Sequence, residues 1–213
     1  MMQLSHEDET ISFNPRTVTS IACEKDDETN EYKFHVTTIH STGTVTFEGD
    51  KSDVAKTLFK DMIKQLQEGE MIILSNKDFD IMLNPQFVTR VTLHENTNKG
   101  LCHIIFETIN TLDSHVITCD TIEKGQEMFE QYIKDVERTD DDAKFVKVKE
   151  NDNETVAINA KFIASIVCEK NAEENNWYVQ ISSIHSIFPD KFTFKTESDA
   201  KKFFQNILEQ IRN

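Results

Sequence analysis

The chain has 213 residues, of which 38 % are hydrophobic, and its 38 acidic against 23 basic residues give a formal net charge of −15. That length fits one large domain or two to three small ones. The charge argues against direct binding to a nucleic-acid backbone or an anionic membrane surface, since phosphate groups are bound by clustered Lys and Arg. No apolar run approaches the roughly 18 residues of a transmembrane helix, and the opening MMQLSHEDET lacks the basic and apolar regions of a signal peptide.

Two nearly identical hexapeptides, SIACEK at 20–25 and SIVCEK at 165–170, differ in one residue. At the same spacing, TTIHS at 37–41 matches SSIHS at 182–186. A more divergent copy lies between them, since LNP at 83–85 matches FNP at 13–15. Because matches at fixed spacing are typical of repeat architectures, we predict three tandem repeat units, at residues 1–68, 69–139 and 140–213.

In chain order, each unit is predicted to begin with two short strands, the second of which ends at an Asn. The hexapeptide strand follows, then a polar hairpin tip and a strand that alternates with period two, as at Tyr32, Phe34 and Val36. A fifth short strand precedes the closing helix. The predicted first, second and fifth strands are residues 2–4, 10–13 and 45–47, then 71–74, 80–83 and 116–119, then 145–148, 155–158 and 192–194.

The closing helices are predicted from apolar residues at i and i+4, which form one stripe that faces the sheet. Thr121 is a predicted N-cap and Thr196 with Asp199 a predicted capping box. Gly125 stands where the other units have Ala, which predicts a close approach of helix and sheet. The paired apolar positions are Leu58, Phe59, Met62 and Ile63, then Met128, Phe129, Tyr132 and Ile133, then Phe203, Phe204, Ile207 and Leu208.

The predicted fold class is α+β, with three tandem repeats of an antiparallel β-meander of four to five strands capped by one C-terminal α-helix. The first unit is expected to be ββββα, because its first strand is weak, and the other two βββββα. This order of elements also fits a small barrel closed by a helix, as in pleckstrin-homology-like domains. No family motif is present.

Cys23 and Cys168 stand at matching positions, where the middle unit has Leu93. A position that accepts Cys and Leu is typical of a core, where a free Cys behaves as a small hydrophobic residue. We therefore expect buried, reduced thiols, and a cytoplasmic protein. Each outer unit offers one Cys and one His, His40 or His185, whereas a zinc site needs three or four ligands. We expect no metal site.

No nucleotide-binding, zinc-protease or serine-hydrolase motif occurs in the sequence. The 38 carboxylates make chance pairs certain, so paired carboxylates neither indicate nor exclude acid–base catalysis. Asn14 and Asn84, each followed by Pro, are read as turn residues. The sequence therefore predicts no catalytic residue, no metal ligand and no cofactor.

Acidic residues concentrate in two hairpin tips, 24–31 and 169–174, and in the linker 137–142, whereas the middle tip HENTNKG is nearly neutral. Such runs are commonly solvated loops. If the two acidic tips face the same way, they could imitate phosphate groups to a basic protein. The candidate partner-binding residues are Asp26, Asp27, Glu28, Glu31, Glu173, Glu174, Asp140, Asp141 and Asp142.

The expected function is a non-enzymatic, acidic protein-binding module. The Asn-, Lys- and Ile-rich composition resembles that of small phage-encoded proteins that disable host machinery. The expected partner is a basic host protein in the host cytoplasm, such as RNA polymerase, its sigma factor, a replication factor or a nuclease, with no direct nucleic-acid or membrane contact. Two alternatives remain: a structural, self-assembling repeat protein, and an enzyme with a site between units.

Overall fold

The computed structural model describes residues 2–6, 9–25, 28–29, 31–40, 42–47, 52–65, 71–75, 79–109, 114–184 and 189–212. The chain divides into two compact units. Unit 1 comprises Met1–Val88, Thr108–Asp113 and Arg138–Asp140, and unit 2 comprises Thr89–Glu107, Ser114–Glu137 and Asp141–Asn213. The predicted α+β class is confirmed, because helices accompany sheets in which the strand pairs with a defined register are antiparallel throughout the described residues.

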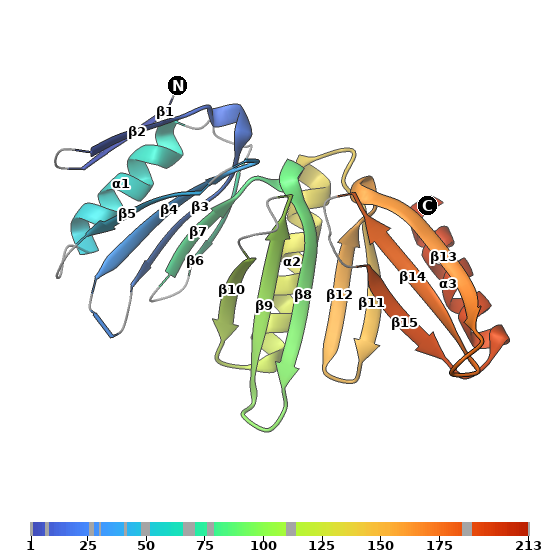
Figure 1. Cartoon of the computed structure of the whole chain (residues 1–213). Coiled ribbons are helices and arrows are strands. Elements are labelled where there is room, and N and C mark those ends of the chain that lie inside the picture. Colours follow the sequence, from blue (N-terminus) through green and yellow to red (C-terminus); the bar gives the residue numbers. More distant parts are fainter. Residues whose placement is uncertain are drawn as a thin grey trace. The chain divides into compact units, whose positions relative to one another are not determined.

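Unit 1 contains a two-stranded sheet, β1–β2, and a five-stranded sheet of order β5-β4-β3-β7-β6 (Figure 1). The helix α1 (Ser52–Gln65) packs against β3 and β4 of the larger sheet and also contacts β1. The strands are β1 (Met2–His6), β2 (Glu9–Phe13), β3 (Val18–Lys25), β4 (Tyr32–Thr38), β5 (Thr42–Phe47), β6 (Ile72–Ser75) and β7 (Phe79–Leu83).

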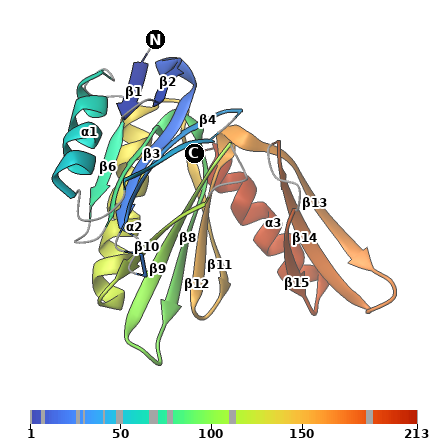
Figure 2. The ribbon, with the colours of Figure 1, turned by 60° about the vertical axis from the view of Figure 1, so that its left-hand side comes forward.

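Unit 2 contains a five-stranded sheet of order β10-β9-β8-β12-β11 and a three-stranded sheet of order β13-β14-β15. Figures 1 and 2 show the helix α3 (Glu197–Arg212) along one face of the three-stranded sheet. The other elements are β8 (Val88–Asn96), β9 (Leu101–Thr108), β10 (Ser114–Cys119), α2 (Ile122–Thr139), β11 (Phe145–Asn151), β12 (Glu154–Asn159), β13 (Ile163–Asn171), β14 (Asn176–Ser183) and β15 (Asp190–Phe194).

Each meander has three strands, so the predicted meander of four to five strands is wrong. The hairpin β6–β7 joins the edge of β3, and the hairpin β11–β12 joins the edge of β8. A short 3-10 helix replaces a tight hairpin turn before each meander, at Pro15–Thr17, Pro85–Phe87 and Ala160–Phe162. That connection turns the chain away, so a hairpin and the meander that follows it belong to different sheets. Among the described residues, no sheet closes into a barrel.

The turns that carry these 3-10 helices are built as the Asn-Pro pattern predicts. The side-chain oxygen of Asn14 accepts a hydrogen bond from the Arg16 N–H, and that of Asn84 accepts one from the Gln86 N–H, both at 3.1 Å. Asn159 makes the same bond to Lys161 without a following Pro. The side chain therefore fixes the turn, and Pro only favours its backbone angle.

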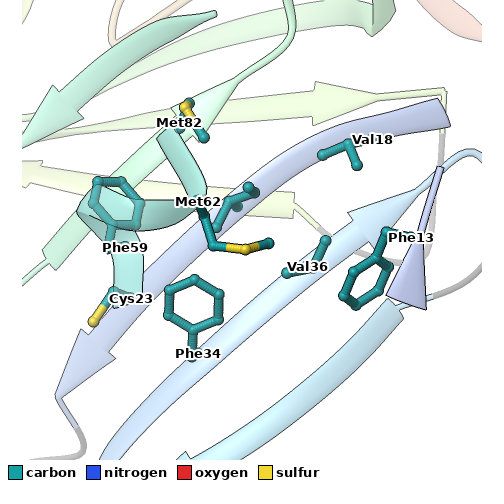
Figure 3. Close-up of a cluster of buried hydrophobic side chains, with 9 residues drawn as sticks. Phe13, Val18, Cys23, Phe34, Val36, Phe59, Met62 and Met82 are labelled. Carbon is teal, nitrogen blue, oxygen red and sulfur yellow. The ribbon is translucent and has the colours of Figure 1, made fainter. Parts of the chain in front are cut away.

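The core of unit 1 gathers apolar side chains from α1 and from strands of both the meander and the hairpin (Figure 3). Phe34 and Phe59 meet edge to face at 6.4 Å between ring centroids. Met82, which comes from the added hairpin, packs into the same cluster. The hairpin is therefore part of the core and stabilises the sheet through side chains as well as backbone bonds. The cluster comprises Phe13, Val18, Ile21, Cys23, Phe34, Val36, Phe59, Met62 and Met82.

In unit 2, β9 alternates buried and half-buried side chains along its whole length, which confirms the predicted period of two. Phe106 of β9 meets Tyr132 of α2 at 4.6 Å between ring centroids. A Cβ added at Gly125 would lie 1.8 Å from the Cys102 Sγ atom, so a larger residue would require Cys102 or the helix to shift. The predicted caps are also confirmed: Thr121 Oγ1 accepts from the Lys124 N–H at 3.2 Å, and Thr196 Oγ1 from the Asp199 N–H at 3.2 Å.

The hairpin β11–β12 connects the two sheets of unit 2. Its edge pairs with β8, while one face packs against the α3 helix through Val146 and Ile158. The Lys147 N–H donates to Gln210 Oε1 of α3 at 2.9 Å, and Gln210 Nε2 donates to the Lys147 carbonyl oxygen at 3.3 Å. One hairpin therefore completes the preceding sheet through its edge and contacts the following helix through its face.

Candidate protein-interaction site

The tip between β13 and β14 presents two acidic side chains on a well-defined turn. The side-chain oxygen of Asn171 accepts from the Glu173 and Glu174 N–H groups at 3.1 and 3.4 Å. Asn175 has a φ of 52°, in the left-handed region that Asn tolerates, and Asn176 Nδ2 donates to Glu174 Oε2 at 2.9 Å. Glu173 and Glu174 are both exposed. The tip therefore holds two carboxylates in solvent.

The tip between β8 and β9 forms a similar turn without the acidic residues. Asn96 Oδ1 accepts from the Lys99 N–H at 3.2 Å, and Gly100, with a φ of 66°, stands where the other tip has Asn175. A nearly neutral sequence is therefore sufficient for this turn, and the carboxylates of Glu173 and Glu174 are not needed to form it.

The first acidic tip, between β3 and β4, is described in part. Asp26 and Asp27 lie outside the described residues, Glu28 is exposed and Glu31 is half-buried. At its base, His35 Nε2 lies 3.2 Å from Glu24 Oε1, across the β3–β4 pair. Of the predicted residues in this tip, the structure places Glu28 in solvent.

The linker residues after α2 differ from one another in exposure. Asp140 is 8 % exposed, so it contributes no exposed carboxylate, whereas Asp141 and Asp142 are exposed. Asp140 belongs to unit 1 and the next two residues to unit 2. The acidic surface that the sequence predicts in this linker is therefore limited to Asp141 and Asp142.

Unit 2 contains a cluster of charged side chains that no sequence pattern predicts. Arg90 of β8 pairs through Nη1 with Asp190 Oδ1 of β15 at 2.6 Å, and its Nη2 lies 3.9 Å from Glu150 Oε2. Burial raises the pKa of Asp190, Glu150 and Glu107, while the Arg90 guanidinium opposes that rise in each. The partners are far apart in sequence and lie on different strands, so only the tertiary structure brings them together. The ion pair links the two sheets of unit 2.

The cysteines differ in burial, and burial raises the pKa of three of them. Cys23 is buried as predicted, but Cys168 is half-buried, because its strand β13 lies at the edge of its sheet. Burial, reinforced by the neighbouring Cys119, raises the pKa of the Cys102 thiol to about 11. Burial also raises the pKa of Cys119 and Cys168. At these three positions, burial therefore disfavours the thiolate, which is the form that attacks electrophiles and binds metals.

Among the described residues, no group of three or more His, Cys, Asp or Glu side chains is placed to hold a metal ion. His40 is exposed, and its counterpart His185 lies outside the described residues. Within the same part of the chain, no helix combines the length and apolar character required to cross a membrane.

One edge of β13 has no strand paired to it among the described residues, and the sequence patterns do not reveal this. Among the described residues, β13 pairs with β14 alone, whereas β3 and β8 are paired on both sides. Most side chains of β13 are exposed or half-exposed, and Val167 is 38 % exposed. Unpaired backbone groups along an edge strand can pair with another chain. This open edge depends on the order of strands in the sheet, and the hexapeptide sequence does not predict that order.

Comparisons with known proteins return no match: no family model, no curated protein and no solved structure is similar to this chain.

Proposed function

We propose that this chain is a non-enzymatic protein-binding module that uses its acidic loops to bind a basic protein. The observation that carries the proposal is the tip with Glu173 and Glu174, where two exposed carboxylates stand on a turn that the β8–β9 tip forms without acidic residues at these positions. Carboxylates that the fold does not require, in a chain with a net charge of −15, are available for electrostatic recognition.

The partner class follows from the charge. A basic surface that normally binds nucleic acid would attract carboxylates held at fixed positions, because complementary potentials increase the rate of encounter. The proposed partners are RNA polymerase, a sigma factor, a replication factor or a nuclease, bound by a phage-encoded inhibitor or DNA mimic in the host cytoplasm. The phage origin rests on composition alone.

We also propose that the chain consists of three related segments, near residues 1–68, 69–139 and 140–213. In support, β3 pairs with β4 and β13 with β14 in the same register at a spacing of 145 residues, with a bulge at the same place. The Ile39 N–H donates to Thr17, that of Ile109 to Phe87 and that of Ile184 to Phe162, each at 2.9 Å. In this proposal, segment boundaries and sheet boundaries differ, since the hairpins β6–β7 and β11–β12 add to the sheet of the preceding segment.

A site between segments is the enzymatic alternative, and the Arg90 cluster is where it would be sought. The short Arg90–Asp190 pair favours a structural role there, because the guanidinium compensates a carboxylate that burial disfavours in its charged form. The protein-binding proposal is therefore preferred.

The test neutralises the tip and compares it with an equal charge change elsewhere. Glu173→Gln with Glu174→Gln removes two tip charges, and Glu123→Gln with Glu127→Gln removes two exposed charges from α2 as the matched control. Each chain is immobilised and used to capture proteins from a bacterial lysate, which are identified by mass spectrometry. Stopped-flow kinetics then follow the purified partner. We expect the tip variant to bind several-fold more slowly and the wild type to weaken with salt.

The control variant should retain most of the association rate, since its charges lie on α2 and not on the tip. Equal rates for the tip variant and the wild type, together with an affinity that does not depend on salt, would contradict electrostatic recognition by this tip.

A further inference from the structure

Two sheets of this protein are completed in the same way, by a hairpin that adds to the first strand of a meander. Ser20 of β3 lies opposite Leu83 of β7, and Arg90 of β8 lies opposite Ile158 of β12. With spacings of 70 residues between the accepting strands and 75 between the added strands, all five residue pairs of the first junction match those of the second. The two junctions therefore have the same register, although the side chains at the paired positions differ.

The third accepting strand, β13, has the sequence of the first. It contains SIVCEK where β3 contains SIACEK, and it pairs with the strand that follows it in the register of β3. Among the described residues, however, no hairpin occupies its other edge. Ser165 is exposed where Ser20 is buried, and Val167 is exposed where Ala22 is buried. β13 therefore has nearly the sequence of β3, which is paired on both edges, but among the described residues it is paired on one edge only.

The hairpin β1–β2 has the sequence of an added hairpin. Its second strand reads ETISF (9–13), and the corresponding part of β12, which occupies the edge of β8, reads ETVAI (154–158). Within the described part of the chain, β2 pairs only with β1. Asn14, at its end, is exposed, whereas Asn84 at the end of β7 is buried and donates through Nδ2 to the Val18 carbonyl oxygen at 3.2 Å.

We propose that the β1–β2 hairpin of one copy of this chain adds head to tail to the β13 edge of a second copy, so that residues 9–13 pair antiparallel with residues 165–169 and extend the three-stranded sheet. The observed register carries over directly. Phe13 would lie opposite Ser165, and Ile11 opposite Val167. Thr10 would lie opposite Cys168, and Glu9 opposite Glu169. Addition of a strand to an edge provides affinity through backbone hydrogen bonds and specificity through alternate side chains.

This contact joins different surfaces of the two copies, so each added copy presents a new β13 edge at one end and a new hairpin at the other. Such an interface produces open chains or closed rings of copies. It also covers Val167, which is exposed in the single chain. The inference does not depend on the proposed binding of a basic partner, because it uses β2 and β13 and not the tip carboxylates.

One pair in the proposed register has like charges, Glu9 and Glu169. At the corresponding places Glu24 lies opposite Phe79, and His94 lies opposite Glu154, so neither observed junction has two carboxylates there. Like charges directly opposite each other weaken a strand pair. Association is therefore expected to be weak and reversible at neutral pH, and to strengthen when either carboxylate is neutralised.

Sedimentation velocity over a range of concentrations is the first test. The wild type should form oligomers as concentration rises. Val167→Asp should weaken association roughly tenfold or more, because it places an unpaired carboxylate in the interface. Val116→Asp, at a somewhat more exposed position on β10, is the control and should associate as the wild type does. Equal loss of association in both variants would attribute oligomers to general hydrophobic contact and overturn the proposal.

Glu169→Gln tests the register itself. It should strengthen association by roughly two- to fivefold, the range expected for relief of one cross-strand repulsion. Wild type and Glu169→Gln that both remain monomeric at high concentration would overturn the proposal.

The decisive experiment is a cross-link to the native Cys168. A Thr10→Cys variant should form a disulfide with Cys168 under mild oxidation, since cross-strand Cα distances of about 4.5–5.5 Å suit a disulfide. A Gln3→Cys variant, on β1, is the control and should not form it. A ladder of disulfide-linked copies, with residues 10 and 168 joined in mass spectra, is the expected result. A link within one chain, or no link at all, would overturn the assignment of a second copy.

Discussion

Strands β3 and β13 share five of six residues in their central hexapeptide and the same pairing with the strand that follows, yet they differ in burial. Ala22 is 2 % exposed and its counterpart Val167 is 38 % exposed. Cys23 is buried and Cys168 is half-buried. The difference lies in the neighbours: β3 has β7 on its second edge, and β13 has no described strand there. The burial of a strand is therefore set by the strand that joins it and not by its own residues.

The largest expected difference between the two strands is in their tolerance of charge. Ala22→Asp should destabilise the fold by about 3–5 kcal/mol, because it leaves an unpaired carboxylate at a buried position. Val167→Asp should change the free energy of unfolding by about 0.5 kcal/mol or less, as exposed substitutions do. Urea denaturation of dilute protein measures both. Similar losses at the two positions would show that the β13 edge is covered in the single chain.

A smaller difference is expected for the asparagines that end the hairpins. Asn84→Ala should cost about 1–3 kcal/mol, because it removes the donor to the buried Val18 carbonyl oxygen as well as the turn bond to Gln86. Asn14→Ala should cost about 1 kcal/mol or less, because its turn is exposed. Thermal unfolding of both variants measures the difference, and Asn14→Asp, which retains a side-chain acceptor, controls for the turn bond. Equal losses of stability in Asn84→Ala and Asn14→Ala would contradict the stabilising role of the Asn84 bond to Val18.

The smallest effect concerns thiol reactivity and does not depend on a change in stability. Cys168 should react with a small maleimide faster than Cys23, because it is half-buried and Cys23 is buried. Burial raises the pKa of Cys168, so the thiolate fraction is low at pH 7 and its labelling rate should increase as pH rises toward that pKa. Mass spectrometry after timed labelling gives both rates. Faster labelling of Cys23 than of Cys168 would contradict the difference in burial. Slower labelling of Cys168 at high protein concentration would indicate that a second copy covers the β13 edge.

Local features of this fold are predictable because they depend on residues that are close in sequence. The alternation of Cys102, Ile104 and Phe106 predicts a strand with one buried face, and β9 has one. Thr121 and Thr196 predict where α2 and α3 begin, within a residue or two. The absence of a side chain at Gly125 predicts a close approach of helix and sheet, and the structure shows this approach at Cys102. Each signal is a side-chain property acting over one turn or one strand.

Of the candidate site, the exposed carboxylates of Glu173 and Glu174 are predictable, because polar residues between two alternating strands indicate a hairpin tip. The burial of Asp140 is not, since the linker reads as uniformly acidic. Nor is the Arg90–Asp190 pair, which joins residues 100 positions apart. Charge patterns predict where carboxylates are numerous but not which of them remain in solvent.

The sequence by itself determines the strands, the helices and their caps, and the turns at Asn14, Asn84 and Asn159. Only the tertiary structure decides which edge each hairpin joins, and hence that β7 completes the sheet of β3 and β12 that of β8. The physical reason is that strand edges pair through backbone N–H and C=O groups, which are the same in almost every residue. Two strands with nearly identical sequences, β3 and β13, can therefore lie in the centre of one sheet and at the edge of another.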